Sequence, residues 1–309
     1  MKRLLITGAR GFIGRHSLAA ALEAGFEVHA LASSAGGLLE RQGSGATWHV
    51  GDLLENDVPQ SLIESIRPTH ILHAAWVTAH NSYWTSPENL NWLKAGARLA
   101  EAFGKHGGRR FVAVGTCAEY DWTHGEMIEG RTPERPTTLY GEIKLRHSAM
   151  LQAAARDLGF SACTGRIFFA YGPHENPQRF IPYVCRRLNL GQEALVSSGQ
   201  FRRDFMHVED VAHGFIALID SDVSGVCNVS SGQSSLLADI VSELGRVSGR
   251  ADLIRFDPLL DRLGDPPSLV GANKLLRSTG WAPSVALEEG LRQTYEWWRH
   301  QPESDTRKG

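Results

Sequence analysis

The chain is poor in cysteine, has no long apolar run and carries almost no net charge. Its four cysteines stand far apart with no C-x-x-C pair, which argues against a zinc site and is typical of a reducing compartment. No segment reaches the ~18 consecutive apolar residues of a membrane-spanning helix. The formal charge of −2 provides no basic surface for nucleic acid or for an acidic membrane. We therefore expect a cytoplasmic protein with no metal, nucleic-acid or membrane partner.

The rest of the composition is that of an ordinary globular protein. Hydrophobic residues make up 42% of the chain and charged residues 21%. The sequence has no internal repeat and no low-complexity tract, which argues against a solenoid. A length of 309 residues allows one large α/β domain, alone or with a smaller lobe.

Apolar strand-like runs alternate with helix-like segments through the first half of the chain. The expected strands are Arg3–Ile6, Phe26–Ala32, Thr47–Val50, His70–Ala74, Arg110–Gly115 and Ser161–Phe168. The expected helices are His16–Gly25, Val58–Ile66, Asn89–Lys105 and Tyr140–Leu158. This alternation predicts an α/β fold with a doubly wound parallel sheet, whose ligand lies over the carboxyl ends of the strands.

The second half of the chain is less regular and predicts a smaller lobe. Helices are expected at Phe180–Leu190, Glu209–Asp220, Leu236–Ser248 and Leu287–Trp298, with one more strand at Val226–Val229. We expect a dinucleotide-binding domain over residues 1–171, with sheet elements returning from about 205–232. The substrate-binding lobe would be 172–204 and 233–300, and the polar tail 301–309 would be frayed.

A glycine turn follows the first strand and precedes the first helix. Gly8, Gly11 and Gly14 form a G-x-x-G-x-x-G pattern within Thr7–Gly14. Glycines in this setting allow a tight turn and let a pyrophosphate approach the helix N-terminus, where free N–H groups favour an anion. The pattern predicts a dinucleotide site; the alternative is a glycine-rich turn in some other α/β protein.

A possible acid/base group stands at the start of a predicted helix. Tyr140 and Lys144 are four residues apart, so both side chains lie on one helix face. A nearby ammonium group lowers the pKa of a tyrosine from about 10, which would suit Tyr140 to proton transfer at a carbonyl or carbinol oxygen. Thr116 ends a predicted strand and could hydrogen-bond the same oxygen. Alone, the Tyr–Lys pair could equally be incidental, and Thr116 could simply cap a turn.

Taken together, these motifs resemble those of the extended short-chain dehydrogenases/reductases, in the nucleotide-sugar epimerase, dehydratase and ketoreductase group. The resemblance covers the chain from Met1 to about Trp298 and keeps the family's order. It rests on Thr7–Gly14, Gly51–Leu53, His73–Ala75, Gly115–Tyr120, Tyr140–Lys144, Tyr171–Pro173, Arg203–Val211 and Gly280–Pro283.

The resemblance implies a Rossmann-type fold, a nicotinamide cofactor and a role for each matching residue. Tyr140 is the acid/base, Thr116 assists it, and Lys144 orients the nicotinamide ribose. The implied cofactor contacts are Gly8, Gly11, Phe12, Ile13, Gly14, Asp52, Leu53, Ala74 and Ala75, together with Tyr140 and Lys144. Arg203 and Arg262 resemble the arginines that meet the substrate diphosphate, as a guanidinium suits phosphate. A homodimer through Asn89–Lys105 and Tyr140–Leu158 is also implied.

The end of the second strand favours NADP(H) over NAD(H). NAD enzymes usually carry an acid there that bonds the ribose 2′-hydroxyl. Here the residues are Leu31–Ser34, with no carboxylate. Arg10, in the glycine turn, would attract a 2′-phosphate, and Ser33 and Ser34 would add hydroxyl donors. NAD(H) remains the alternative, with Arg10 a solvent-facing turn residue.

Departures from the family pattern reduce the number of reactions that the chain could be expected to catalyse. Cys117 and Ala118 stand where related dehydratases have Asp-Glu, and Cys117 is instead a candidate for contact with the sugar. Arg179 stands in the loop where a second acid/base histidine would be sought, and it is a further candidate for contact with the substrate. Glu119 replaces an apolar residue and could bond a sugar hydroxyl. Phe169 stands where many relatives have an asparagine that contacts the substrate phosphate.

These observations predict an oxidoreductase that reduces a keto group, at C4, of a nucleotide-linked deoxysugar with NADP(H). Tyr140 would protonate the alkoxide as hydride arrives. Two alternatives stay open: a nucleotide-sugar 4-epimerase that retains its cofactor, and a non-catalytic sensor of NADP(H).

Overall fold

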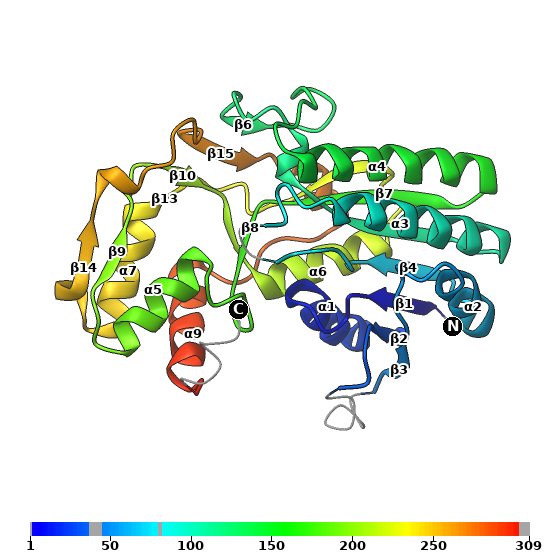
Figure 1. Cartoon of the computed structure of the whole chain (residues 1–309), viewed down its shortest axis with the longest axis horizontal. Coiled ribbons are helices and arrows are strands. Elements are labelled where there is room, and N and C mark those ends of the chain that lie inside the picture. Colours follow the sequence, from blue (N-terminus) through cyan, green and yellow to red (C-terminus); the bar gives the residue numbers. More distant parts are fainter. Residues whose placement is uncertain (1, 37–44, 80–81, 303–309) are drawn as a thin grey trace.

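A seven-stranded parallel sheet forms the centre of the larger part of the molecule in this computed structural model, which describes residues 2–36, 45–79 and 82–302 (Figure 1). Its strand order is β12-β7-β5-β4-β1-β2-β3. The strands are β1 (Arg3–Thr7), β2 (Glu27–Ala32), β3 (Thr47–Val50), β4 (His70–His73), β5 (Arg110–Thr116), β7 (Ser161–Ile167) and β12 (Gly225–Val229). The predicted fold class is confirmed.

Helices cover both faces of this sheet. α1 (Phe12–Glu23) and α6 (Val208–Ile219) contact each other on one face, while α2 (Val58–Ile66), α3 (Glu88–Lys105) and α4 (Leu139–Leu158) pack on the other (Figure 1). Because side chains alternate along a strand, Leu4 and Ile6 of β1 enter the core with α1, and Leu5 enters the core with α3. Burial on both faces explains why β1 is a continuous apolar run.

The remaining elements form a smaller lobe beside the carboxyl edge of the sheet (Figure 1). A second core joins α5 (Phe180–Asn189), α7 (Leu237–Ser248) and α9 (Leu287–Arg299). Short strands complete the lobe and its border with the large sheet: β6 (Glu126–Met127), β8 (Phe169–Tyr171), β9 (Ala194–Val196), β10 (Arg202–Arg203), β11 (Phe205–His207), β13 (Ser235–Leu236), β14 (Ile254–Phe256) and β15 (Ser268–Gly271). A one-turn helix, α8 (Lys274–Arg277), precedes α9.

The predicted long elements are present, with ends that differ by a few residues at most. The largest difference is in α1, which begins at Phe12 rather than His16 because the glycine turn itself ends at the helix N-cap, Gly11. The short strands of the lobe were not predicted. Most of the tail predicted to be frayed, residues 303–309, lies outside the described residues. In the described part of the chain, no helix is both long and apolar enough for a membrane span.

Candidate active site

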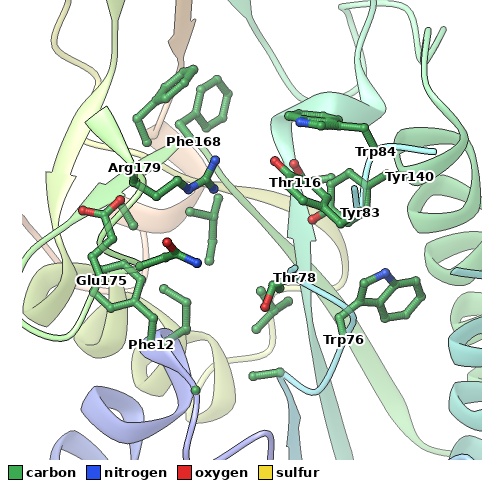
Figure 2. Close-up of a pocket in the computed structure, with 18 of the residues that line it drawn as sticks. Phe12, Trp76, Thr78, Tyr83, Trp84, Thr116, Tyr140, Phe168, Glu175 and Arg179 are labelled. Carbon is green, nitrogen blue, oxygen red and sulfur yellow. The ribbon is translucent and has the colours of Figure 1, made fainter. Parts of the chain in front are cut away.

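A cavity of about 1240 Å³ lies at the carboxyl edge of the large sheet, with the lobe as its other wall (Figure 2). The strand register assembles the first wall. Thr7 of β1 pairs with His73 of β4, so the glycine turn and Ala74–Ala75 leave the sheet side by side. β5 pairs with β4 and carries Thr116 at its end. Gly8, Ala74, Ala75 and Thr116 all line the cavity.

The glycine turn has the shape that a dinucleotide requires. Gly8 has φ +67°, and a Cβ on it would lie 2.7 Å from the backbone nitrogen of Ala75. A Cβ on Gly14 would lie 2.1 Å from the carbonyl oxygen of Gly8. Gly11, the N-cap of α1, has no side chain that could accept from the first N–H groups, which stay available to an anion. The turn therefore fits a pyrophosphate at the N-terminus of α1.

The remaining expected cofactor residues lie along the same wall, with one exception. Arg10, Phe12, Ile13, Ser33, Asp52 and Leu53 line the cavity. Ser34 is outside the lining and instead accepts from Arg10 Nη1, with its hydroxyl oxygen at 3.2 Å and its carbonyl oxygen at 3.4 Å. This contact places the Arg10 guanidinium at the end of β2, the position where a ribose 2′-substituent would be read.

Thr116 and Tyr140 are brought together although they are far apart in sequence. Thr138, the N-cap of α4, accepts from the Gly141 N–H at 3.1 Å and fixes the start of the helix. A Cβ on Gly141 would lie 2.3 Å from the carbonyl oxygen of Ala118, so only glycine lets α4 begin so close to the end of β5. The side chains of Thr116 and Tyr140 lie beside each other, and the threonine hydroxyl opposes the rise in the pKa of the tyrosine. The pair faces the cavity (Figure 2).

The expected effect of Lys144 on Tyr140 is not found. Burial raises the pKa of Tyr140 above its ordinary value, and the neighbouring Tyr83 raises it further. The Lys144 ammonium group donates to the carbonyl oxygen of Val114 and lies 4.0 Å from the centre of the Trp76 ring. Burial also lowers the pKa of Lys144 to about 8. The expectation of a lowered Tyr140 pKa is therefore corrected: burial raises the pKa of Tyr140, and the lysine ammonium group is directed to other partners.

Glu119 and Cys117 were both expected from the sequence to contact the sugar, but their surroundings in the structure do not suit that role. Glu119 has no exposed surface; it accepts from the Thr116 N–H at 2.9 Å and pairs with Arg166 Nε at 2.8 Å. Its expected role as a sugar ligand is therefore wrong. Cys117 does line the cavity, but burial raises the pKa of its thiol to about 12, with Asp204 adding to the shift. It is therefore a neutral thiol rather than a base near pH 7.

The two arginines expected to bind phosphate, Arg203 and Arg262, differ in how exposed their side chains are. Arg203 is 4% exposed and donates from Nη1 to the carbonyl oxygens of Arg202 and Pro266, at 2.8 and 2.9 Å. Its Nη2 pairs with Asp265 at 2.8 Å. Arg203 thus holds the loop before β15 while also lining the cavity, so its contact with a diphosphate stays a prediction. Arg262 and Arg179 both line the cavity and are exposed.

Aromatic residues that the sequence reasoning missed line the cavity around Tyr140. The Tyr83 and Trp84 rings lie edge-on to the Tyr140 ring, at centroid distances of 4.9 and 5.6 Å. Trp84 also contacts Trp122 edge-on at 6.2 Å. The one available signal was composition, because four of the chain's eight tryptophans, including Trp76, fall between positions 76 and 122.

Comparisons with known proteins agree with this geometry. The model of the NAD dependent epimerase/dehydratase family matches residues 4–230. A UDP-glucose 4-epimerase of Bacillus subtilis is 25% identical, covering 95% of this chain and 96% of its own length. UDP-glucuronic acid decarboxylase 1 of Xenopus tropicalis is 28% identical, covering 98% and 73%. The structure of Thermus thermophilus UDP-glucose 4-epimerase in complex with NAD is similar with a TM-score of 0.82 at 26% identity, covering 96% of this chain and 99% of that one.

Proposed function

The chain belongs to the NAD-dependent epimerase/dehydratase family, and from that premise we propose that it reduces a keto group, at C4, of a nucleotide-linked deoxysugar with NADP(H). The observation that carries the proposal is the placement of Thr116 and Tyr140 side by side in the cavity that the glycine turn also lines. A phenol and a hydroxyl that converge on one point can hold and protonate a single oxygen atom.

The chain supplies binding, orientation and a proton. Gly8, Gly11 and Gly14 would hold the cofactor pyrophosphate, and the bound nicotinamide would supply the hydride. Tyr140 would give its proton to the oxygen of the substrate, while Thr116 would hydrogen-bond that oxygen and orient the carbonyl. Tyr83 and Trp84 pack around Tyr140 and limit the access of water to the proton that moves.

The neutral thiol of Cys117 and the buried contacts of Glu119 favour simple reduction over dehydration or epimerisation at a neighbouring carbon. Such reactions remove a proton from carbon and need a second base near the sugar. Cys117 is held as a neutral thiol, and Glu119 is engaged with Thr116 and Arg166. Tyr140 is left as the acid of the proposed reaction.

The position of Arg10 supports NADP(H), although the Thermus thermophilus relative was solved with NAD. Arg10 lies against Ser34 at the end of β2, where the sequence offers no carboxylate to a 2′-hydroxyl. Titration of the protein with NADPH and NADH in parallel tests this choice. We expect tighter binding of NADPH; equal affinities would contradict the assignment.

Turnover tests the reaction itself. A nucleotide-linked 4-keto-6-deoxyhexose should be consumed together with NADPH by the unmodified protein, and this consumption should be lost in Tyr140→Phe. A protein that binds NADPH but turns over no keto-sugar of this class would instead be a cofactor sensor.

A 4-epimerase is the second candidate, because the Bacillus subtilis relative carries that name and is similar over nearly its whole length. An epimerase uses the same threonine, tyrosine and lysine but keeps its cofactor bound through the cycle. The cofactor that co-purifies separates the two: tightly retained NAD indicates an epimerase, and freely exchanging NADPH a reductase.

A further inference from the structure

Arg179 reaches across the cavity from the lobe toward the acid/base tyrosine. It is the N-cap of α5 and lines the cavity. Figure 2 shows its guanidinium group pointing from the lobe toward Thr116, Tyr83 and Tyr140 on the opposite wall. A cation from one wall of the cavity is thus directed at the reacting groups of the other.

The contact between the two walls runs through Tyr83. The guanidinium carbon of Arg179 lies 5.9 Å from the centre of the Tyr83 ring. Tyr83 is 7% exposed, and its ring lies edge-on to Tyr140 at 4.9 Å. The charge of Arg179 therefore lies one buried aromatic ring away from Tyr140.

The pKa values of Arg179 and Tyr83 shift in the directions that such an interaction would give. Burial lowers the pKa of Arg179, but Tyr83, Glu175 and Tyr140 outweigh this and raise it overall. Conversely, burial raises the pKa of Tyr83, and Arg179 and, more weakly, Arg262 oppose that shift.

Other charged groups near the site are less able to stabilise an ionised Tyr140. Lys144 is directed to the Val114 carbonyl oxygen and the Trp76 ring. Glu119 and Cys117 act in the opposite direction and disfavour the phenolate. Burial raises the pKa of Glu175 to about 8, so near pH 7 this acid is largely neutral and leaves most of the Arg179 charge uncompensated.

We propose that Arg179 is a positioning residue for the reaction, which acts through Tyr83 to stabilise the negative charge that Tyr140 acquires when it gives up its proton. The inference rests on the proposed function, in which Tyr140 is the acid. In that step the O–H bond of Tyr140 breaks and a new O–H bond forms on the substrate oxygen. Hydride from the nicotinamide reduces the carbonyl carbon, and solvent later returns a proton to Tyr140. A cation beside the phenolate lowers the free energy of this state.

The test measures the ionisation of residue 140 directly and needs no substrate. A fluorinated tyrosine, whose phenol is more acidic than that of tyrosine, is incorporated at position 140 of the full-length protein, and its ¹⁹F chemical shift is followed against pH. Arg179→Gln removes the charge and should raise the pKa of this phenol by roughly one unit, a tenfold change in its ionisation constant. Arg179→Lys keeps the charge and should largely restore the original titration.

Arg187→Gln is the matched control. Arg187 is on the same helix and donates instead to the Glu193 carbonyl oxygen and the Gln192 side chain. Its removal should leave the titration unchanged. An unchanged titration in Arg179→Gln, or equal shifts in Arg179→Gln and Arg187→Gln, would overturn the proposal.

Kinetics then separate this inference from the proposed function. If Arg179→Gln raises KM for a keto-sugar without any shift in the titration, Arg179 binds substrate and the proposal is wrong. If Tyr140→Phe keeps full activity, the proposed function fails, whatever the titration shows.

Discussion

Replacing Glu119 with alanine should destabilise the protein more than most single substitutions do. Glu119 lies under the active site, where its side chain pairs with Arg166 at 2.8 Å and accepts from the Thr116 N–H at 2.9 Å. The side chains of Glu119 and Arg166 are 0% and 1% exposed. Removing one partner of a buried ion pair leaves an uncompensated charge in a medium that solvates it poorly, which typically costs about 3–5 kcal/mol.

The surroundings of Arg166 place the loss from the ion pair at the lower end of that range. Arg166 Nη2 also pairs with Glu134 at 2.7 Å, and the guanidinium carbon lies 4.3 Å from the centre of the Tyr120 ring. Glu134 is partly exposed and would still neutralise much of the charge. The Thr116 N–H would lose its acceptor, which adds about 1–3 kcal/mol if the group stays buried and unpaired. With about 3 kcal/mol from the ion pair and at least about 1 kcal/mol from the N–H, we expect Glu119→Ala to lower the free energy of unfolding by roughly 4 kcal/mol.

Urea denaturation with matched variants tests this value. Glu119→Gln keeps the shape and an acceptor for the Thr116 N–H, so it should cost less than alanine. Glu142→Ala removes the same residue type from an exposed pair with Arg146 on α4, and should change stability by no more than about 0.5 kcal/mol. The reasoning is refuted if Glu119→Ala and Glu142→Ala shift the unfolding midpoint equally at unchanged slope.

Five further outcomes follow from the site and from the proposed assembly. Tyr140→Phe should lower turnover about 100-fold or more and leave cofactor affinity nearly unchanged in a binding titration, because only the transferable proton is lost. Lys144→Ala should weaken both cofactor binding and turnover. Arg10→Ala should weaken NADPH about 10- to 150-fold, the equivalent of roughly 1.5–3 kcal/mol for a charge-assisted contact, and leave NADH nearly unchanged, while Ser33→Asp should shift preference toward NADH. Light scattering at micromolar concentration should show a dimer through α3 and α4; a monomer would rule out that interface.

The sequence predicted the large sheet well because its signals are local. In β1, Leu4 and Ile6 enter one core and Leu5 the other, so burial on both faces appears directly as an uninterrupted apolar run. The glycine turn is local as well, because its three glycines fall within Gly8–Gly14 directly after β1. The short strands of the lobe lack such a signal: β10 has two residues and depends on pairing with β13 and β15.

The sequence predicted which residues lie at the site, but it did not predict which partners their side chains contact. Glu119 was assigned to the substrate because it replaces an apolar residue of the family pattern, yet its partner, Arg166, is 47 positions away. Lys144 lies one helical turn from Tyr140, as expected, but its ammonium group is directed to Val114 on β5. Spacing along a helix fixes which face a side chain shares. It does not fix which distant carbonyl or carboxylate will compete for its charge.

Phe169 replaces the asparagine that many relatives carry at this position, and its surroundings bear on how a substrate phosphate would be bound. An asparagine was expected there to meet the substrate phosphate, and the aromatic ring raised doubt about that subsite. In the structure the Arg203 guanidinium carbon lies 5.6 Å from the Phe169 ring centre and 5.4 Å from that of Phe201, while its Nη2 pairs with Asp265. The loss of the asparagine and the engagement of the arginine thus occur together at one end of the cavity. If the substrate carries a diphosphate, Arg262 is the exposed cation on that wall to meet it. Arg262→Ala should therefore raise KM for a nucleotide-linked sugar more than Arg203→Ala raises it at equal folded fraction, and the reverse order would instead identify Arg203 as the phosphate ligand.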